Sequence, residues 1–346
     1  MSMENFNTKL STIVKQIKLV IGVFVLTIVI SIFYFLGFFD VNISNRNKSE
    51  TTILTNDSTE FWLAPDINSI TDGKQKDLVL YGKELIVHTS KYLGPKGSVS
   101  QISNGMNCQN CHMEAGTKIF GNNYGSVAAN YPKYRARSGK EEDIYKRVND
   151  CFERSLNGKA LDTLSKEMQA IKAYIEFLGS NVEKGKKAEG SGFKDLAFLD
   201  RAADPKKGKE VYVAKCQTCH QANGEGVLNA DGIEYSFPPL WGDHAYNDKA
   251  GLFRLSNFAK YAKYNMPLGT SHENPQLTDE EAWDLAAFVN SQIRPTMETM
   301  NDWPQISEKP IDHPFGPFSD EFSEVQHKYG PFKPIKNKKD EKKKSA

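Results

Sequence analysis

Apolar residues first gather in one uninterrupted block near the N-terminus. Residues 19–39 carry no charged side chain, and a run of this length can cross the hydrocarbon core of a bilayer as a helix. Three lysines precede the block, and Asp40 follows it directly. Because basic residues are retained on the cytoplasmic side, the pattern predicts one N-terminal transmembrane helix with residues 1–18 in the cytoplasm.

A cleaved signal peptide is the alternative interpretation of this block. The apolar core of a signal peptide is normally shorter and is followed by a small-residue cleavage site, whereas Phe38-Phe39-Asp40-Val41-Asn42 follows here. An uncleaved anchor is therefore favoured. Residues 40–60 are mostly polar and rich in Asn and Ser, a composition typical of a flexible stalk.

Beyond the stalk, apolar residues recur at helical spacing in two blocks, residues 61–180 and residues 204–300. The spacing predicts helices over residues 81–88, 141–156, 165–178 and 278–293. The Lys- and Gly-rich start of residues 181–203 predicts a linker between the blocks. Residues 301–346 form an arm rich in Pro and aromatic residues without a regular period, and we expect its lysine-rich end to be disordered.

Each block contains one Cys-x-x-Cys-His motif, made by Cys108, Cys111 and His112 in the first and by Cys216, Cys219 and His220 in the second. This is the attachment pattern of c-type haem, in which the thiols form thioethers and the histidine binds iron. A zinc half-site would need further nearby ligands, and a thioredoxin-like pair would need a preceding strand; neither context is present. The motifs predict two covalently bound haem c groups and a mainly α fold of two tandem class I cytochrome c domains.

The register of the repeat suggests the second axial ligand of each iron. A class I domain supplies this ligand from the loop before its last helix, usually as Met before Pro, and Met266-Pro267 fits that position. On the register of the last helices, Cys151 falls one residue from the position of Met266. For Cys151, an iron ligand and a buried small residue are open alternatives.

Three other side chains are rival ligands in the first domain: His88, Met106 and Met113. Both methionines lie too close in sequence to His112 to reach the opposite face of a haem. Met168 falls inside the last helix and is expected to pack in the core.

Polar residues around Cys151 indicate an anion site. Arg147 and Ser155 lie four residues on either side of it, and positions four apart share one face of a helix. With Arg137, they would form a cleft suited to a small dianion, because guanidinium donors match oxyanions. Surface arginines, or arginines paired with haem propionates, are the alternative.

Composition narrows the function classes further. There are 44 Lys and Arg residues and 43 Asp and Glu residues, a net charge of +1, so no overall field favours nucleic acid. Haem of the c type is attached outside the energy-transducing membrane. We therefore expect a single-pass protein of a bacterial inner membrane with its haem domains in the periplasm.

The chain resembles dihaem thiosulfate dehydrogenases, which are related to the sulfur-oxidation cytochromes. The resemblance extends from Phe61 to Ile335 and rests on these runs: Tyr92-Leu93-Gly94-Pro95-Lys96-Gly97, Asn104-Gly105-Met106-Asn107, Tyr134-Arg135-Ala136-Arg137-Ser138-Gly139, Arg147-Val148-Asn149-Asp150-Cys151, Arg154-Ser155-Leu156-Asn157-Gly158 and Gln326-His327-Lys328-Tyr329-Gly330-Pro331-Phe332. It implies the coupling of two thiosulfates to tetrathionate, reversible in some members, with two electrons passing to a cytochrome or a membrane-bound acceptor.

The resemblance also implies individual roles: His112 and Cys151 on the iron of the first, catalytic haem; His220 and Met266 on the second; and Cys151, Arg137, Arg147 and Ser155 at the thiosulfate site. Some relatives carry a rival ligand, Lys, just before the Met, where this chain has Asn265. Ligand exchange at the second haem is therefore not expected.

An axial thiolate lowers the potential of a haem and an axial Met raises it, so electrons would run from the first haem to the second. Cys151 is also a candidate nucleophile that leaves the iron and bonds transiently to substrate sulfur. Two other functions are open: a non-catalytic dihaem electron-transfer protein, and a carrier in which Cys151 holds a persulfide for a partner.

Overall fold

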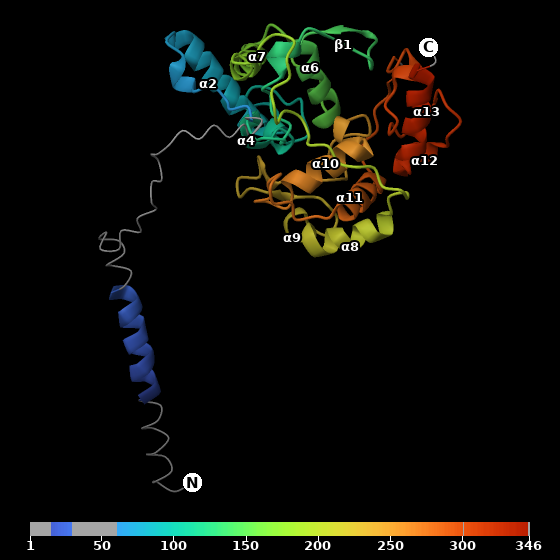
Figure 1. Cartoon of the computed structure of the whole chain (residues 1–346). Coiled ribbons are helices and arrows are strands. Elements are labelled where there is room, and N and C mark those ends of the chain that lie inside the picture. Colours follow the sequence, from blue (N-terminus) through green and yellow to red (C-terminus); the bar gives the residue numbers. More distant parts are fainter. Residues whose placement is uncertain (1–14, 30–60, 300, 345–346) are drawn as a thin grey trace, which may run out of the picture. The chain divides into compact units, whose positions relative to one another are not determined.

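The computed structural model describes residues 15–29, 61–299 and 301–344 of a chain that divides into two units, Met1–Ser58 and Thr59–Ala346 (Figure 1). In the first unit, residues 15–29 form a helix whose large apolar side chains are 40–69% exposed. Of the helices in the described ranges, none has both the length and the apolarity that crossing a membrane requires. Residues 30–39 of the expected anchor, and the expected stalk at 40–60, lie outside the described residues.

The second unit is mainly helical, with two small antiparallel sheets, β1-β2 and β3-β4. Its first domain contains η1 (Ile67–Ser69), α2 (Gly73–Val87), α3 (Thr89–Leu93), η2 (Cys108–Asn110), α4 (Met113–Gly116), α5 (Val127–Asn130), β1 (Lys133–Arg135), β2 (Lys140–Glu142), α6 (Ile144–Asp150), η3 (Cys151–Ser155) and α7 (Lys166–Leu178). Its second domain contains α8 (Pro205–Lys215), α9 (Gln217–His220), β3 (Val227–Leu228), β4 (Tyr235–Phe237), η4 (Gly251–Phe253), α10 (Leu255–Asn265) and α11 (Asp279–Ser291).

In each domain the first long helix packs directly against the last one, α2 against α7 and α8 against α11. Glycine permits both close approaches. A Cβ atom on Gly82 would lie 2.0 Å from the carbonyl oxygen of Ala170, and one on Gly208 would lie 1.8 Å from that of Asp284. Both glycines precede a Lys-Glu pair, so the two domains repeat this packing contact in sequence as well as in space.

The expected helix over residues 141–156 is wrong at its start. Residues 140–142 form β2, which pairs with β1 in a hairpin whose register sets Arg135 opposite Lys140. Gly139 makes the turn possible because its φ of 64° is a left-handed conformation that favours glycine. The helix begins only after Asp143, whose side chain accepts a hydrogen bond from the backbone N–H of Lys146 at 2.8 Å.

The predicted linker is not a free tether. Residues 181–203 contain no regular element, but Ala188, Ser191 and Leu196 are buried. The backbone N–H of Phe120 donates to the Gly190 carbonyl at 2.7 Å, which fixes this segment to the first domain. Close packing overrides the tendency of Lys- and Gly-rich sequence toward disorder.

The C-terminal arm carries η5 (Ile306–Glu308), α12 (Glu324–Tyr329) and α13 (Phe332–Lys344). The expected disorder of the lysine-rich end is wrong as far as Lys344. Phe332 and Ile335 are buried at the start of α13, and the Phe332 ring lies 5.6 Å from the ring of Trp283 in α11. This apolar anchor accounts for a helix whose later turns are mostly lysine.

Candidate active site at the first haem-binding motif

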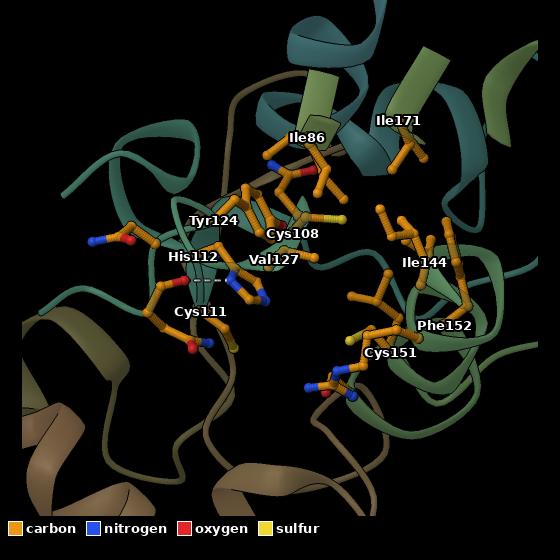
Figure 2. A pocket seen from close by; sticks show the side chains of 18 of the residues that line it. Ile86, Cys108, Cys111, His112, Tyr124, Val127, Ile144, Cys151, Phe152 and Ile171 are labelled. Atoms are coloured by element: carbon orange, nitrogen blue, oxygen red, sulfur yellow. Dashed lines mark hydrogen bonds between the residues drawn. The ribbon is translucent and has the colours of Figure 1, made fainter. Parts of the chain in front are cut away.

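A cavity opens beside the first Cys-x-x-Cys-His motif (Figure 2). Its walls combine apolar side chains from α2, α6 and α7 with the motif and with the segment that follows α6. Six of the residues predicted for the first site line it: Cys108, Cys111, His112, Arg147, Cys151 and Ser155. The structure therefore brings together residues that span 48 positions of sequence, from 108 to 155.

His112 is held with one ring nitrogen free. Its Nδ1 lies 2.6 Å from the carbonyl oxygen of Asn122 (Figure 2). A carbonyl only accepts, so Nδ1 carries the proton and Nε2 is left with its lone pair, as an iron ligand requires. Tyr124 stacks on the ring at 4.4 Å, and burial lowers the pKa of His112 to about 4, which keeps the imidazole neutral.

The two thiols of the first motif are buried in the same cavity. Burial raises the pKa of both Cys108 and Cys111 to about 12. Thr89 fixes the first of them, because its hydroxyl donates to Cys108 Sγ at 3.2 Å and accepts from the Cys108 backbone N–H at 2.9 Å. Neutral sulfur atoms beside a free imidazole nitrogen and an apolar wall fit a covalently attached haem.

Cys151 lies across the cavity from Cys111 and His112 (Figure 2). It ends α6 and begins η3, a single π-helical turn, and such turns are frequent at functional sites. Met266 occupies the corresponding place at the end of α10. The position of Cys151 supports its predicted equivalence to Met266, and its ligation of iron stays a prediction.

Arg147 contributes a positively charged guanidinium to the lining of this cavity. Within the described ranges its guanidinium makes no side-chain hydrogen bond, and it is only half-buried. The Cys151 thiolate raises the pKa of Arg147 more than any other neighbour does. A guanidinium beside the sulfur of Cys151 is suited to an incoming oxyanion.

Arg137 is placed differently from the expectation, because it is absent from the residues that line this cavity. Its Nη1 donates to the carbonyl of Lys249 at 2.9 Å, and its guanidinium lies 5.5 Å from the ring of Trp303 in the C-terminal arm. Burial lowers the pKa of Arg137 to about 10, and the nearby charges of Arg154 and Arg147 add to this effect. Arg137 therefore adds positive potential near Arg147, and its direct contact with substrate stays a prediction.

A second cavity, with an empty volume of about 630 Å³, brings together Cys216, His220 and Met266. The Nδ1 of His220 lies 2.8 Å from the Pro238 carbonyl, which again leaves Nε2 free. Cys219 belongs to α9 but does not line this cavity. Met106 and Cys111 line both cavities, so the two haem sites adjoin one another.

Two of the three rival ligands are occupied elsewhere, whereas Met106 lines both haem cavities. His88 Nδ1 lies 3.1 Å from the carboxylate of Glu234, and Met113 Sδ lies 3.1 Å from the Tyr261 hydroxyl. Met168 is fully buried in α7, as expected of a core residue. Near Met266, the Lys263 ammonium is bound to the Leu277 carbonyl at 2.6 Å, which is consistent with no lysine exchanging as a ligand.

Two residues of this region escaped sequence reasoning. The hydroxyl of Tyr261, on the helix that leads to Met266, donates to the carbonyl of Asn110 inside the first motif at 2.6 Å. Glu234, in the hairpin of the second domain, contacts the residue before Cys108. No local sequence pattern identifies either residue, because each one contacts the first haem-binding region from the second domain.

Residues 98–183 match the family model described as SoxA/TsdA, cytochrome c domain, and residues 205–292 match cytochrome c. Two curated relatives are named thiosulfate dehydrogenase. That of Psychrobacter arcticus is 36% identical over 243 residues (69% of this chain, 71% of the relative), and that of Allochromatium vinosum is 38% identical over 221 residues (62% and 80%).

A solved structure titled thiosulfate dehydrogenase (TsdBA), from Marichromatium purpuratum, aligns with a TM-score of 0.63 and 28% identity. The alignment covers 69% of this chain and 50% of that chain. The two domain matches confirm the predicted fold of two cytochrome c domains, each with one covalently bound c-type haem. On the identity and coverage of the curated relatives, the chain belongs to the thiosulfate dehydrogenase family of dihaem c-type cytochromes.

Proposed function

We propose that this protein oxidises thiosulfate, joining two thiosulfate dianions into tetrathionate and passing two electrons to a cytochrome-type acceptor. The observation that carries the proposal is the shared cavity of Cys151, Arg147 and the first haem-binding motif. A dihaem electron carrier, the alternative, has no use for a thiol and a free guanidinium inside the haem cavity. The family membership favours the enzyme as well.

The residues suggest how two like charges are brought together. Arg147 offsets the repulsion between the dianions, because its guanidinium lines the same cavity as Cys151. The Cys151 thiolate and the outer sulfur of one thiosulfate form an S–S bond, releasing two electrons. The outer sulfur of the second thiosulfate then attacks that of the first, so tetrathionate forms and the thiolate leaves. The charges balance, and no proton is transferred.

When bound, the two haems supply two one-electron acceptors, with thiolate ligation lowering the potential of the first and Met ligation raising that of the second. The protein contributes the adjoining cavities, since Met106 and Cys111 belong to both walls. The same residues serve the reverse reaction, so the proposal extends to tetrathionate reduction.

The test is an assay of the purified full-length chain in detergent. We expect thiosulfate-dependent reduction of ferricyanide, with one tetrathionate formed for every two ferricyanide ions reduced. Tetrathionate-dependent oxidation of a reduced dye measures the reverse direction. Absence of turnover in both directions, with both haems attached, would favour the electron carrier.

The proposal includes a membrane anchor at residues 19–39, with the N-terminus in the cytoplasm and the haem domains in the periplasm of a bacterial inner membrane. It is supported by the preceding lysines and by the exposed apolar side chains of the helix at residues 15–29. Such an anchor would keep the haem domains close to a membrane-bound acceptor.

Deletion of residues 1–58 tests the anchor, provided that the export signal is replaced by a cleavable one. We expect the full-length chain to stay in the membrane fraction after a high-salt wash, because an apolar segment of this length is not released by screening charge. The shortened chain should be recovered from the periplasm with both haems. Salt-extractable full-length protein would contradict the anchor.

A further inference from the structure

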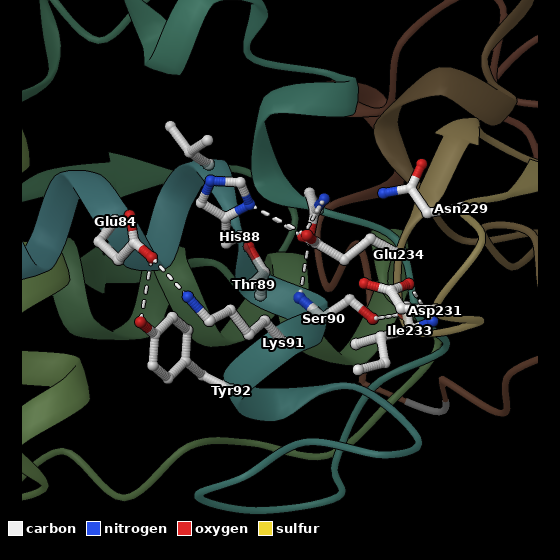
Figure 3. Close-up of polar contacts among 12 residues, drawn as sticks. Glu84, His88, Thr89, Ser90, Lys91, Tyr92, Asn229, Asp231, Ile233 and Glu234 are labelled. Atoms are coloured by element: carbon white, nitrogen blue, oxygen red, sulfur yellow. Dashed lines mark hydrogen bonds and ion pairs between the residues drawn. The ribbon is translucent and has the colours of Figure 1, made fainter.

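The hairpin of the second domain reaches across to the first haem-binding motif. Residues 229–234 join β3 to β4, and their tip lies against α3 of the first domain (Figure 3). The Ser90 hydroxyl donates to the Ile233 carbonyl at 2.6 Å, and the Lys96 ammonium donates to the Gly232 carbonyl at 3.1 Å. These contacts fix the hairpin against the segment of the first domain that precedes the haem-binding motif.

Glu234 is the centre of this contact. Its carboxylate accepts from Asn107 Nδ2 at 3.0 Å and lies 3.1 Å from His88 Nδ1 (Figure 3). The side chain of Glu234 is only 12% exposed, whereas that of His88 is 38% exposed. A carboxylate of the second domain is therefore buried against the first domain, held by a neutral amide and an imidazole.

Asn107 transmits this contact to the haem attachment residue, because it directly precedes Cys108. Its Oδ1 accepts from the backbone N–H of Ser90 at 2.8 Å, and its backbone N–H donates to Asn110 Oδ1 at 2.7 Å. Thr89, between His88 and Ser90, holds the Cys108 sulfur and backbone. Glu234 is thus one side chain away from the residue that anchors the first haem.

We propose that Glu234 is a positioning residue through which the second domain fixes the attachment loop of the first haem and holds a negative charge beside it. A carboxylate at low dielectric stabilises the more positive, oxidised iron, so it lowers the potential of the first haem relative to the second. The electrostatic effect favours electron transfer from the first haem to the second. The inference needs both haems but not the proposed substrate.

Glu234→Gln removes the charge while keeping the size of the side chain and an acceptor for Asn107. We expect the midpoint potential of the first haem to shift upward and that of the second to stay unchanged, in a spectroelectrochemical titration without thiosulfate. Asp231→Asn is the matched control, because this exposed carboxylate on the same hairpin accepts from the backbone N–H of Ile233 at 2.9 Å and has no hydrogen bond to the first domain in the described part of the chain. It should shift neither potential.

Glu234→Ala also removes the hydrogen bonds, which tests positioning separately from charge. Hydrogen exchange of the backbone amides at residues 104–112 is expected to quicken about tenfold or more, since hydrogen bonds to a charged group are lost. Glu234→Gln should quicken it less. If neither variant moved the first potential or the exchange, or if Asp231→Asn moved that potential as much as Glu234→Gln, the proposal would be overturned. Each result is independent of whether thiosulfate is turned over.

Discussion

Replacing Cys151 by glycine is expected to lower thiosulfate-dependent turnover by roughly 100-fold or more, because an activated nucleophile contributes at least that much. Both haems should stay attached, since Cys108, Cys111, Cys216 and Cys219 are untouched. The measurement is ferricyanide reduction with thiosulfate, normalised to the haem content of each preparation. Full turnover in Cys151→Gly would remove this residue from the reaction.

The location of the thiol is the reason for expecting so large an effect. Cys151 is the nucleophile candidate that lines the first cavity without belonging to a haem attachment motif. Cys151 and Arg147 line the same cavity, and the charge interaction with Cys151 is the largest effect that raises the pKa of Arg147. Removing the sulfur leaves a guanidinium that still attracts thiosulfate but has no partner for covalent bonding.

Cys151→Met separates the two roles assigned to this sulfur. A thioether can bind iron but cannot form an S–S bond with substrate, and it raises the potential that a thiolate lowers. We expect the Met variant to be as inactive as the Gly variant, with a higher midpoint potential at the first haem. Full turnover with an altered potential would show that the cysteine tunes the haem and that the covalent step is wrong.

Sequence reasoning succeeded where the relevant spacing is short. The intervals from Arg147 to Cys151 and from Cys151 to Ser155 are local, and all three residues line the same cavity. Residues four positions apart on a helix lie on the same face of that helix, so their proximity follows from the local sequence. The Cys-x-x-Cys-His motifs are local in the same way.

Sequence reasoning is less informative where a turn or a contact with a distant residue decides where a side chain or helix lies. Arg137 lies only ten residues before Arg147, but it contacts Lys249 and Trp303 and does not line the cavity, so its contact with substrate stays a prediction. The helix at the C-terminal end depends on the burial of Phe332 beside Trp283, which no local pattern reveals. No local pattern distinguishes Glu234 from the other acidic residues of the chain, because its contact with Asn107 exists only in the folded protein.

Replacing Arg147 by glutamine is expected to lower kcat/KM for thiosulfate by about 10- to 150-fold. A hydrogen bond to a charged group contributes about 1.5–3 kcal/mol, and about 1.4 kcal/mol corresponds to a factor of ten. The guanidinium has no side-chain hydrogen bond elsewhere in the described ranges, so its loss falls on the substrate rather than on the fold. The measurement is steady-state kinetics with thiosulfate as the varied substrate.

Arg135→Gln is the matched control, because Arg135 lies on β1 outside the lining of the cavity, with its Nε 3.9 Å from the carboxylate of Glu142. It removes the same charge from the same domain, so it accounts for any general loss of attraction for a dianion. Arg147→Lys keeps the charge without the planar fork of donors and should recover only part of the lost kcat/KM. Equal losses in Arg135→Gln and Arg147→Gln would mean that overall charge, not a bound guanidinium, draws thiosulfate to Cys151.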